Sequence, residues 1–275
     1  MIPMPEDAKQ KITALFQQVA NRYDNPAMRY FPFCGDRMIT HLRPRPGEKI
    51  LDIATGTGAV ALPAAQAVAP HGRVQAIDLA ENMLNIAANN LQRAGLNNVD
   101  FHLMDAESLD FKSRYFDAVT CSFGIFFLSD MQAALKEWKR VLKPGGKVIF
   151  TTFSANAFAP LAEQFRADLE LFDVTFPEET WLRLTTETEC LELLHSAGFE
   201  NNQTTTEQLG YHLNSPADWW EIILSSGLRG FLNALDNEQQ EQLQQRHLAN
   251  IQSHVTDKGL WLDVETLFAI GQRPA

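Results

Sequence analysis

The feature that most constrains the fold is a regular alternation of short apolar segments with longer helical ones between residues 47 and 153. Five short apolar segments are typical of buried strands. They cover residues 49–53, 74–77, 99–103, 116–121 and 147–153. Strands separated by helices predict a parallel sheet with helices on both faces, and this makes residues 47–153 the predicted core of an α/β fold.

The segments between these strands have the apolar spacing of helices. An Ala-rich helix is predicted over residues 59–69, and a second over 80–94, where Gly95 ends it. A third is predicted over residues 131–142. The run Pro144-Gly145-Gly146 then predicts a turn into the fifth strand.

The N-terminal residues 1–46 form a helical segment before this core. Residues 8–20 place Ile12, Leu15, Phe16 and Val19 at helical spacing, which predicts an amphipathic helix. A loop is expected over residues 21–36, followed by a short helix that ends near Arg43.

The alternation breaks after residue 153. We expect a helical insertion over residues 154–185 and a continuation of the core over 186–213, with a helix at 186–197 and a strand at 208–213. A helical block follows over 214–257, and residues 258–275 carry a final strand, because apolar and polar side chains alternate over 260–270.

Chemistry is concentrated in the loop between the first strand and the first helix, Leu51-Asp52-Ile53-Ala54-Thr55-Gly56-Thr57-Gly58. Glycines let a backbone approach a ligand closely, and the helix that follows offers free N–H groups. Asp78 ends the second strand, where it could accept hydrogen bonds from both hydroxyls of a ribose. A nucleotide-containing ligand is the expected occupant.

Two cofactors compete for this loop. Gly56 to Ala61 fits the G-x-G-x-x-A pattern of dinucleotide binding, so an NAD-dependent oxidoreductase is one alternative. Asp52 argues against it, because a carboxylate beside a pyrophosphate is repelled, whereas one beside the ammonium and sulfonium of S-adenosylmethionine (SAM) is attracted. The third strand ends in Asp105-Ala106, which offers a carboxylate and an N–H to an adenine edge.

The motifs in order resemble those of class I SAM-dependent methyltransferases, and most of all the ubiquinone/menaquinone-biosynthesis (UbiE-like) group. The resemblance covers about residues 10–153. It rests on Leu51 to Gly58, Asp78, Asp105-Ala106, the run Phe116 to Val119, the run Val141 to Gly146, Ser122 to Ile125, and Phe16-x-x-Val19-Ala20-x-x-Tyr23-Asp24. It implies a Rossmann-like, seven-stranded, mostly parallel sheet, with an antiparallel last strand.

The resemblance also implies which residues bind SAM. Asp52, Ala54, Gly56 and Gly58 would border its methionine part, and Asp78 would hold the ribose. The adenine would lie beside Leu79 and Met83, with Asp105 and Ala106 at its amino edge. Ser122 and Phe123 would lie under the methyl group, and Tyr23 would close over the cofactor.

No catalytic residue is assigned from the sequence. Methyl transfer from a sulfonium needs a general base only when the nucleophile must lose a proton. His102, His195, His212, His247 and Tyr211 have suitable side chains, but nothing places any of them over the methyl group.

The helical block over residues 214–257 bears on the substrate. It is more apolar than a solvated helix pair should be, which predicts either a lid over an apolar or aromatic substrate or an accessory core. Trp219 and Trp220 lie about 100° apart on a helix, so we expect one to pack on the catalytic domain and the other to face the pocket or a partner. A non-catalytic SAM-binding protein is the third functional alternative.

Charge and cysteine content narrow the partners and the compartment. The net charge of −11 repels nucleic acid, so a small-molecule substrate is expected, and a homodimer is compatible with the sequence. No apolar run is long enough for membrane insertion, and residues 1–7 lack the features of a signal peptide. Cys34, Cys121 and Cys190 have neither metal-ligand nor disulfide spacing, which favours a cytoplasmic protein without a metal.

Overall fold

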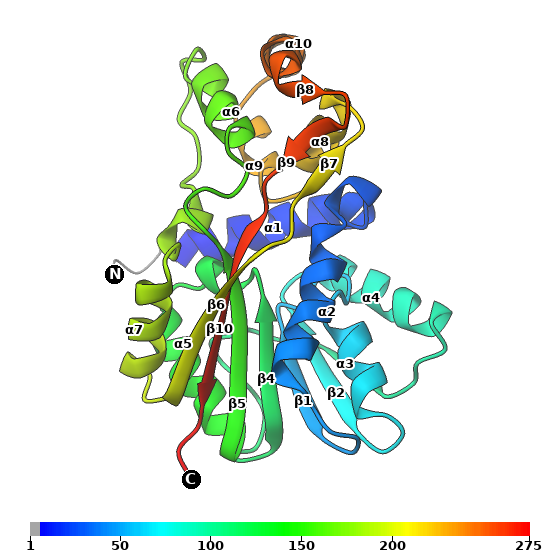
Figure 1. Ribbon diagram of the computed structural model, residues 1–275, viewed down its shortest axis with the longest axis vertical. Coiled ribbons are helices and arrows are strands. Elements are labelled where there is room, and N and C mark those ends of the chain that lie inside the picture. The colour runs from blue at the N-terminus through cyan, green and yellow to red at the C-terminus, as the bar shows by residue number, and fades with distance from the viewer. Residues whose placement is uncertain (1–5) are drawn as a thin grey trace.

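A seven-stranded sheet forms the lower part of the molecule in a computed structural model that describes residues 6–275 (Figure 1). Its spatial order is β3 (Val99–Leu103), β2 (Arg73–Asp78), β1 (Lys49–Ile53), β4 (Phe116–Ser122), β5 (Leu142–Phe153), β10 (Glu265–Gln272) and β6 (Glu200–Gln208). Neighbours from β3 to β5 are parallel, and β10 is antiparallel to β5 and β6. The predicted Rossmann-like sheet with an antiparallel last strand is confirmed.

Helices cover both faces of this sheet, as predicted (Figure 1). The bounds of the core helices are α3 (Ala61–Val68), α4 (Glu81–Arg93), α5 (Met131–Val141) and α7 (Glu187–Ser196). They lie within one or two residues of the predicted ones, because each buries an apolar face on the sheet and ends where that face ends. The run Pro144-Gly145-Gly146 is an irregularity within β5 rather than a turn before it, since β5 already pairs with β4 at Leu142.

The expected loop over residues 21–36 is wrong. Helix α1 (Glu6–Tyr23) is followed by a short 3-10 turn, η1 (Pro26–Met28), and then by α2 (Tyr30–Leu42). Pro32 lies in the first turn of α2, where the missing N–H breaks no helical hydrogen bond. Gly35 lets α2 approach the loop after β1 closely, because a Cβ there would come within 2.1 Å of the Ala59 carbonyl oxygen.

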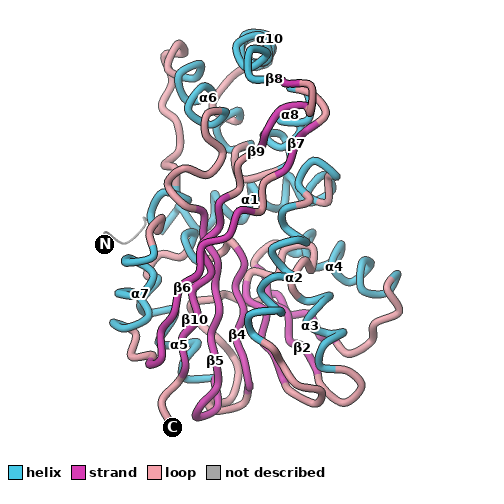
Figure 2. The backbone as a smooth tube through the Cα atoms, in the orientation of Figure 1, coloured by secondary structure: helices cyan, strands magenta, loops and turns pink. Residues whose placement is uncertain are grey.

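A second body, which we call the head, lies above the sheet (Figure 2). It contains a three-stranded antiparallel sheet in the order β7-β9-β8. Its elements are α6 (Leu161–Leu169), β7 (Tyr211–Leu213), α8 (Pro216–Ser225), α9 (Arg229–Leu232), α10 (Asn237–Ile251), η4 (Gln252–His254), β8 (Val255–Thr256) and β9 (Gly259–Leu262). The short helix η3 (Thr180–Arg183) instead packs beside η2 (Ile125–Phe127) and β5, where Arg183 donates hydrogen bonds to the carbonyls of Phe126 and Leu128. The longer helices within residues 154–185 and 214–257 therefore lie in one body, whereas η3 lies at the main sheet.

Two predicted strands are each divided between the main sheet and the head. The predicted strand 208–213 ends β6 and then forms β7, and the predicted strand 260–270 forms β9 and then β10. The side-chain oxygen of Gln208 accepts hydrogen bonds from the N–H groups of Gly210 and Val264. These bonds connect the segment between β6 and β7 to the segment between β9 and β10. Most of β6 was not predicted, because its sequence ENNQTTTEQ has no apolar alternation.

Two sequence-based expectations concern the surroundings of the chain. Across the part that the structure describes, no helix combines the length and the apolar character that a membrane span requires. The expectation of no signal peptide falls mainly on residues 1–5, which lie outside the described residues.

Candidate active site

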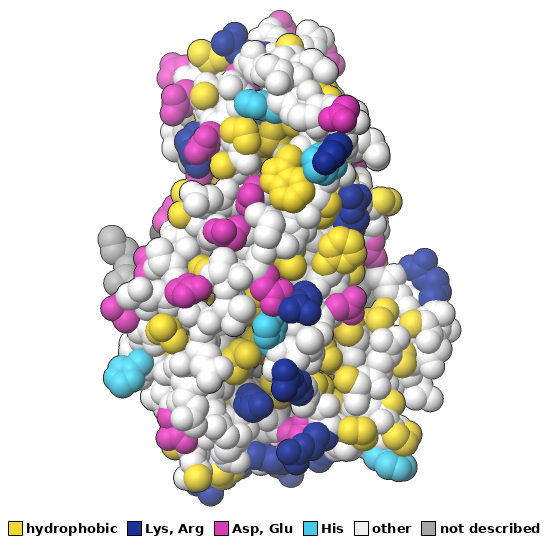
Figure 3. All heavy atoms as spheres, viewed as in Figure 1, with side chains coloured by type: hydrophobic (Ala, Val, Ile, Leu, Met, Phe, Trp, Pro, Cys, Tyr) yellow, Lys and Arg dark blue, Asp and Glu magenta, His cyan; other side chains and the backbone are white. Residues whose placement is uncertain are grey.

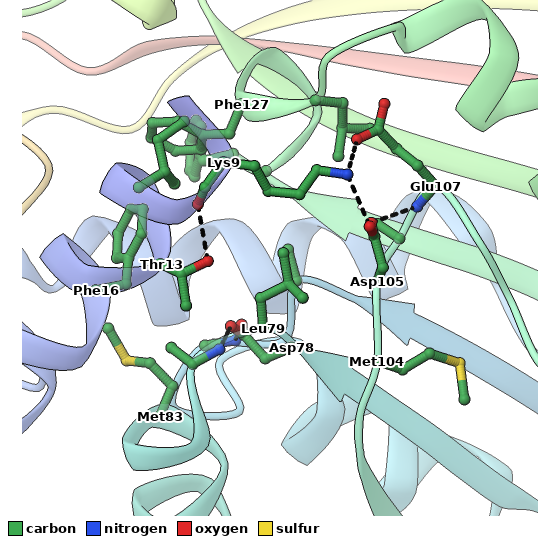
Figure 4. Close-up of a pocket in the computed structure, with 18 of the residues that line it drawn as sticks. Lys9, Thr13, Phe16, Asp78, Leu79, Met83, Met104, Asp105, Glu107 and Phe127 are labelled. Atoms are coloured by element: carbon green, nitrogen blue, oxygen red, sulfur yellow. Dashed lines mark hydrogen bonds and ion pairs between the residues drawn. The ribbon is translucent and has the colours of Figure 1, made fainter. Parts of the chain in front are cut away.

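The site lies at the carboxyl ends of β1 to β4, where the parallel strands face helix α1. A hollow of about 780 Å³, partly open to solvent, lies between them (Figure 4). A smaller hollow adjoins it, and the two share Tyr23, Ala54, Gly56 and Ser122. Open α/β sheets bind their ligands at this edge.

The two hollows gather most of the residues predicted to bind the cofactor. The larger hollow is lined by ten of them: Tyr23, Ala54, Gly56, Asp78, Leu79, Met83, Asp105, Ala106, Ser122 and Phe123. Asp52 lines the smaller hollow. Gly58 lines neither, and at φ +92° it packs on α4, where a Cβ would come within 3.0 Å of Leu91 Cδ1. The positive φ and the close contact with α4 therefore explain why a glycine occupies position 58.

Asp52 is buried beneath the loop that follows β1. Its carboxylate accepts hydrogen bonds from the hydroxyls of Thr55 at 2.6 Å and Thr120 at 2.7 Å. Burial, aided by the nearby charge of Asp78, raises the pKa of Asp52 to about 6. No cation compensates this carboxylate among its described partners, so a positively charged group at the smaller hollow would be attracted to it.

Asp78 fixes the shape of the same loop. Its carboxylate accepts the N–H of Gly56 and the N–H of Ala80, each at 2.9 Å. Burial raises the pKa of Asp78 despite these hydrogen bonds. Because Asp78 also lines the larger hollow, it can both hold the loop and present acceptor lone pairs to a ligand.

The backbone of the loop adopts left-handed conformations at two of its lining residues. Gly56 has φ +55°, and Ala54 has φ +51°, which is unusual for a residue with a Cβ. Gly124 lies opposite the Ala54 methyl group, and a Cβ at Gly124 would come within 2.7 Å of that methyl group. Position 124 therefore has no room for a side chain. Backbone strain of this kind is concentrated at ligand sites.

Asp105 and Ala106 form the wall at the end of β3. One Asp105 oxygen accepts the N–H of Glu107 at 2.9 Å, and the other lies 2.7 Å from the ammonium group of Lys9. The Ala106 carbonyl accepts the indole N–H of Trp138 at 2.8 Å, which fixes this wall from behind.

Sequence reasoning missed the roof of the larger hollow, which α1 provides. Lys9, Ile12, Thr13 and Phe16 lie on one face of α1 and line the hollow (Figure 4). Their i, i+3, i+4, i+7 spacing was visible in the sequence, and the apolar members were recognised as a helix face. Only the fold shows that this face covers a cavity instead of a core.

Tyr23 closes the junction of the two hollows from the end of α1. Its ring stacks on Phe31, with ring centroids 4.9 Å apart and 20° between the planes. Burial, with smaller effects from Asp78 and Asp24, raises the pKa of Tyr23 far above its usual value of 10. The phenol is therefore neutral at physiological pH.

Ser122 and Phe123 form the floor at the end of β4. The Ser122 hydroxyl lies 3.5 Å from the Cys34 sulfur and 3.4 Å from the Thr151 hydroxyl. The Phe123 ring stacks on Phe153 with centroids 4.1 Å apart. One polar group is thus set into an aromatic floor.

The candidate bases lie elsewhere in the described structure. No histidine lines either hollow within residues 6–275, and the Tyr211 hydroxyl donates to the Ala27 carbonyl at 2.6 Å. His247 lies in the head, where its Nε2 accepts the indole N–H of Trp219 at 2.8 Å. The expectation that one of Trp219 and Trp220 faces the pocket or a partner is wrong, because both are buried in the head and neither lines a hollow.

Comparison with known proteins agrees with this geometry. The family model described as the ubiE/COQ5 methyltransferase family matches residues 4–174. Over 159 residues the chain is 36% identical to the aklanonic acid methyltransferase DauC of Streptomyces sp. (strain C5), covering 57% of this chain and 72% of DauC. It is 38% identical over 159 residues to the ubiquinone/menaquinone biosynthesis C-methyltransferase UbiE of Cupriavidus taiwanensis, covering 56% of this chain and 65% of UbiE.

A solved structure shows that the likeness in fold extends over the head. The [4+2]-cyclase SpnF superimposes with a TM-score of 0.65 at 20% identity, covering 100% of this chain and 99% of SpnF. At this identity the likeness concerns the fold alone. The family match and the curated relatives support neither the oxidoreductase nor the non-catalytic alternative. The chain belongs to the ubiE/COQ5 methyltransferase family and is a SAM-dependent methyltransferase of small molecules.

Proposed function

We propose that SAM binds across the two hollows and that the acceptor is a small, planar, apolar or aromatic molecule. The observation that carries this proposal is the series of three carboxylates along the strand ends. Asp52 lies at the smaller hollow, and Asp78 and Asp105 line the larger one. The series matches the polar groups of SAM in order: a cationic amino acid part, a ribose diol and an adenine amino group.

The surroundings of each carboxylate fit the group it would meet. Asp52 has no cationic partner among the described residues, so the ammonium and sulfonium would stabilise its ionised form. Asp78 retains acceptor capacity for hydroxyl groups beyond the two N–H groups it already binds. Asp105 is followed by Ala106, whose N–H could complement its carboxylate at an adenine edge. A pyrophosphate would instead meet the negative charges of Asp52 and Asp78.

The protein's contribution to catalysis would be alignment and exclusion of water. SAM supplies an activated methyl group and a good leaving group. Holding two reactants in line can be worth roughly 7–11 kcal/mol of the barrier. Tyr23, Ser122 and Phe123 surround the junction of the hollows and would align the methyl group there. The described lining offers no histidine as a base, so a proton of the acceptor would have to pass to a carboxylate of the lining or to a group of the acceptor itself.

The aromatic lining supports a planar acceptor. The rings of Phe16 and Phe127 meet edge to face with centroids 5.2 Å apart, and both line the larger hollow. Phe123 adds the stacked floor. DauC and UbiE are named for aklanonic acid and for ubiquinone and menaquinone biosynthesis, which agrees with an acceptor of this kind. Residues 214–257 of the head would act as a lid or as an accessory core.

Partners and compartment follow from charge and thiols. We propose no nucleic acid partner, because the net charge is −11 and the face in Figure 3 carries acidic side chains among the basic ones. A homodimer and a cytoplasmic location remain predictions. Cys34, Cys121 and Cys190 are free and buried, which is compatible with a reducing compartment.

The test combines binding with turnover. Calorimetry should show binding of SAM and S-adenosylhomocysteine (SAH) and none of NAD. Incubation with methyl-labelled SAM and a panel of hydroxylated naphthoquinones and anthraquinones should transfer label to at least one of them. Binding of NAD without SAM would refute the cofactor assignment. Transfer only to aliphatic acceptors would refute the planar acceptor.

A further inference from the structure

Lys9 bridges two carboxylates across the larger hollow. Its ammonium nitrogen lies 2.7 Å from an Asp105 oxygen and 2.6 Å from a Glu107 oxygen (Figure 4). Among the described lining residues of both hollows it is the single Lys or Arg. The bridge therefore joins the roof, α1, to the wall beyond β3.

Solvent screens the Lys9 ion pairs less than it screens an ordinary surface ion pair. The side chains of Asp105 and Glu107 are 29% and 15% exposed. Solvent screens such carboxylates less than exposed ones, so loss of their shared cation would leave two partly buried like charges close together. The bridge should thus hold α1 against this wall.

The rest of α1 is anchored farther along the helix. Gln17 accepts two hydrogen bonds from Asn82, one from its backbone N–H at 2.9 Å and one from its side-chain amide at 3.2 Å. Val19 and Ala20 pack with Ala80 and Met83 in a small cluster separate from the main core. The first turns of α1 instead cover the hollow, and the Lys9 bridge is a polar tie at that end of the roof.

We propose that Lys9 is a positioning residue that holds α1 closed over the adenine end of the bound cofactor. This rests on the proposed cofactor site. A ligand that leaves past α1 must break both ion pairs, whereas a ligand already inside is retained by them. Lys9 would therefore slow dissociation of the cofactor and its product without contacting the reacting atoms.

The dissociation rate of SAH tests this proposal. Lys9→Gln should release SAH three- to tenfold faster than wild type in stopped-flow chase experiments, while Lys9→Arg should stay within twofold. Raising NaCl from 50 to 500 mM should speed release from the wild type and leave Lys9→Gln nearly unchanged, because salt screens the ion pair. Lys258→Gln, the same charge change on an exposed residue of the head, is the control.

A charge reversal guards against a purely structural effect. Lys9→Glu alone should release SAH faster than Lys9→Gln, and adding Glu107→Lys should restore slow release. This double variant also decides the question if Lys9→Gln folds poorly. The proposal would be overturned if Lys9→Gln released SAH at the wild-type rate with the wild-type salt response, or if the reversed pair did not restore slow release. Failure of the wild type to bind SAH would instead overturn the proposed cofactor site.

Discussion

Two buried carboxylate sites in this molecule have opposite surroundings. In the head, Asp168 accepts hydrogen bonds from His247 at 2.8 Å, Asn250 at 2.7 Å and Gln164 at 3.2 Å. At the sheet edge, the donors that Asp52 and Asp78 meet within residues 6–275 are hydroxyl and backbone N–H groups, and both carboxylates border hollows. The head site is saturated with donors, whereas the sheet-edge site keeps capacity for a ligand.

The state of His247 makes the head site a structural one. Its Nε2 accepts the indole N–H of Trp219, so Nδ1 carries the hydrogen that points at Asp168. Burial lowers the pKa of His247 and favours this neutral form. The hydrogen bonds from Trp219 to His247 and from His247 to Asp168 join α8, α10 and α6. None of these three side chains lines either hollow. A fully paired polar network of this kind specifies packing.

The largest effect on stability should come from breaking the head site. Asp168→Ala removes the shared acceptor and leaves buried donors of His247 and Asn250 unpaired, which should cost about 3–5 kcal/mol of unfolding free energy. Chemical denaturation measures this loss. SAM affinity of the folded fraction should stay within twofold of wild type, because Asp168 lines neither hollow. A tenfold loss of SAM affinity would show that the two regions are coupled.

Asp52→Asn should have the opposite effect on stability. The pKa of Asp52 is about 6 in the folded protein against a usual 3.8, so the folded state disfavours its ionised form. Stability is therefore lost as pH rises from about 4 through 6, and removing the charge should gain at most about 3 kcal/mol at pH 8. Below pH 4 the gain should vanish, as pH-dependent denaturation would show.

The same variant should lose cofactor affinity. Without the carboxylate, SAM should bind at least tenfold more weakly, and SAH should lose less because it lacks the sulfonium charge. Calorimetry with both ligands measures the difference. An Asp52→Asn protein that gains no stability at pH 8, or that binds SAM as well as wild type, would remove the distinction between the two carboxylate sites.

The sequence predicted the sheet-edge region well because its signals are local. Each strand there is a short apolar run, and each loop carries the residues that its backbone needs, such as Gly56. Asp52, Asp78 and Asp105 follow or end strands, so parallel pairing alone brings them to one edge. Eleven of the twelve predicted cofactor residues accordingly line the hollows, although their roles remain predictions.

The roof and the head were predicted less well because their structure depends on distant contacts. Lys9 meets Asp105 across 96 residues, and no local pattern shows that pair. The polar strand β6 is stabilised by pairing with β10 and not by burial of its own side chains. No local pattern shows that His247 is buried, because its partners Asp168 and Trp219 lie on two other helices.

The most direct test of the account is the SAM affinity of Asp78→Asn. The substitution removes the charge that would bind the ribose, and charge-assisted hydrogen bonds are worth about 1.5–3 kcal/mol, so the dissociation constant should rise at least tenfold. Asp100→Asn is the matched control, since Asp100 pairs with Arg73 on the sheet and lines neither hollow. Asn keeps one acceptor oxygen, so Asp78→Asn also loses the hydrogen bond from the N–H of Gly56 or of Ala80. We expect both variants to fold, Asp78→Asn with the lower melting temperature, and only Asp78→Asn to be impaired in SAM binding. A folded Asp78→Asn protein that binds SAM as tightly as wild type would contradict it.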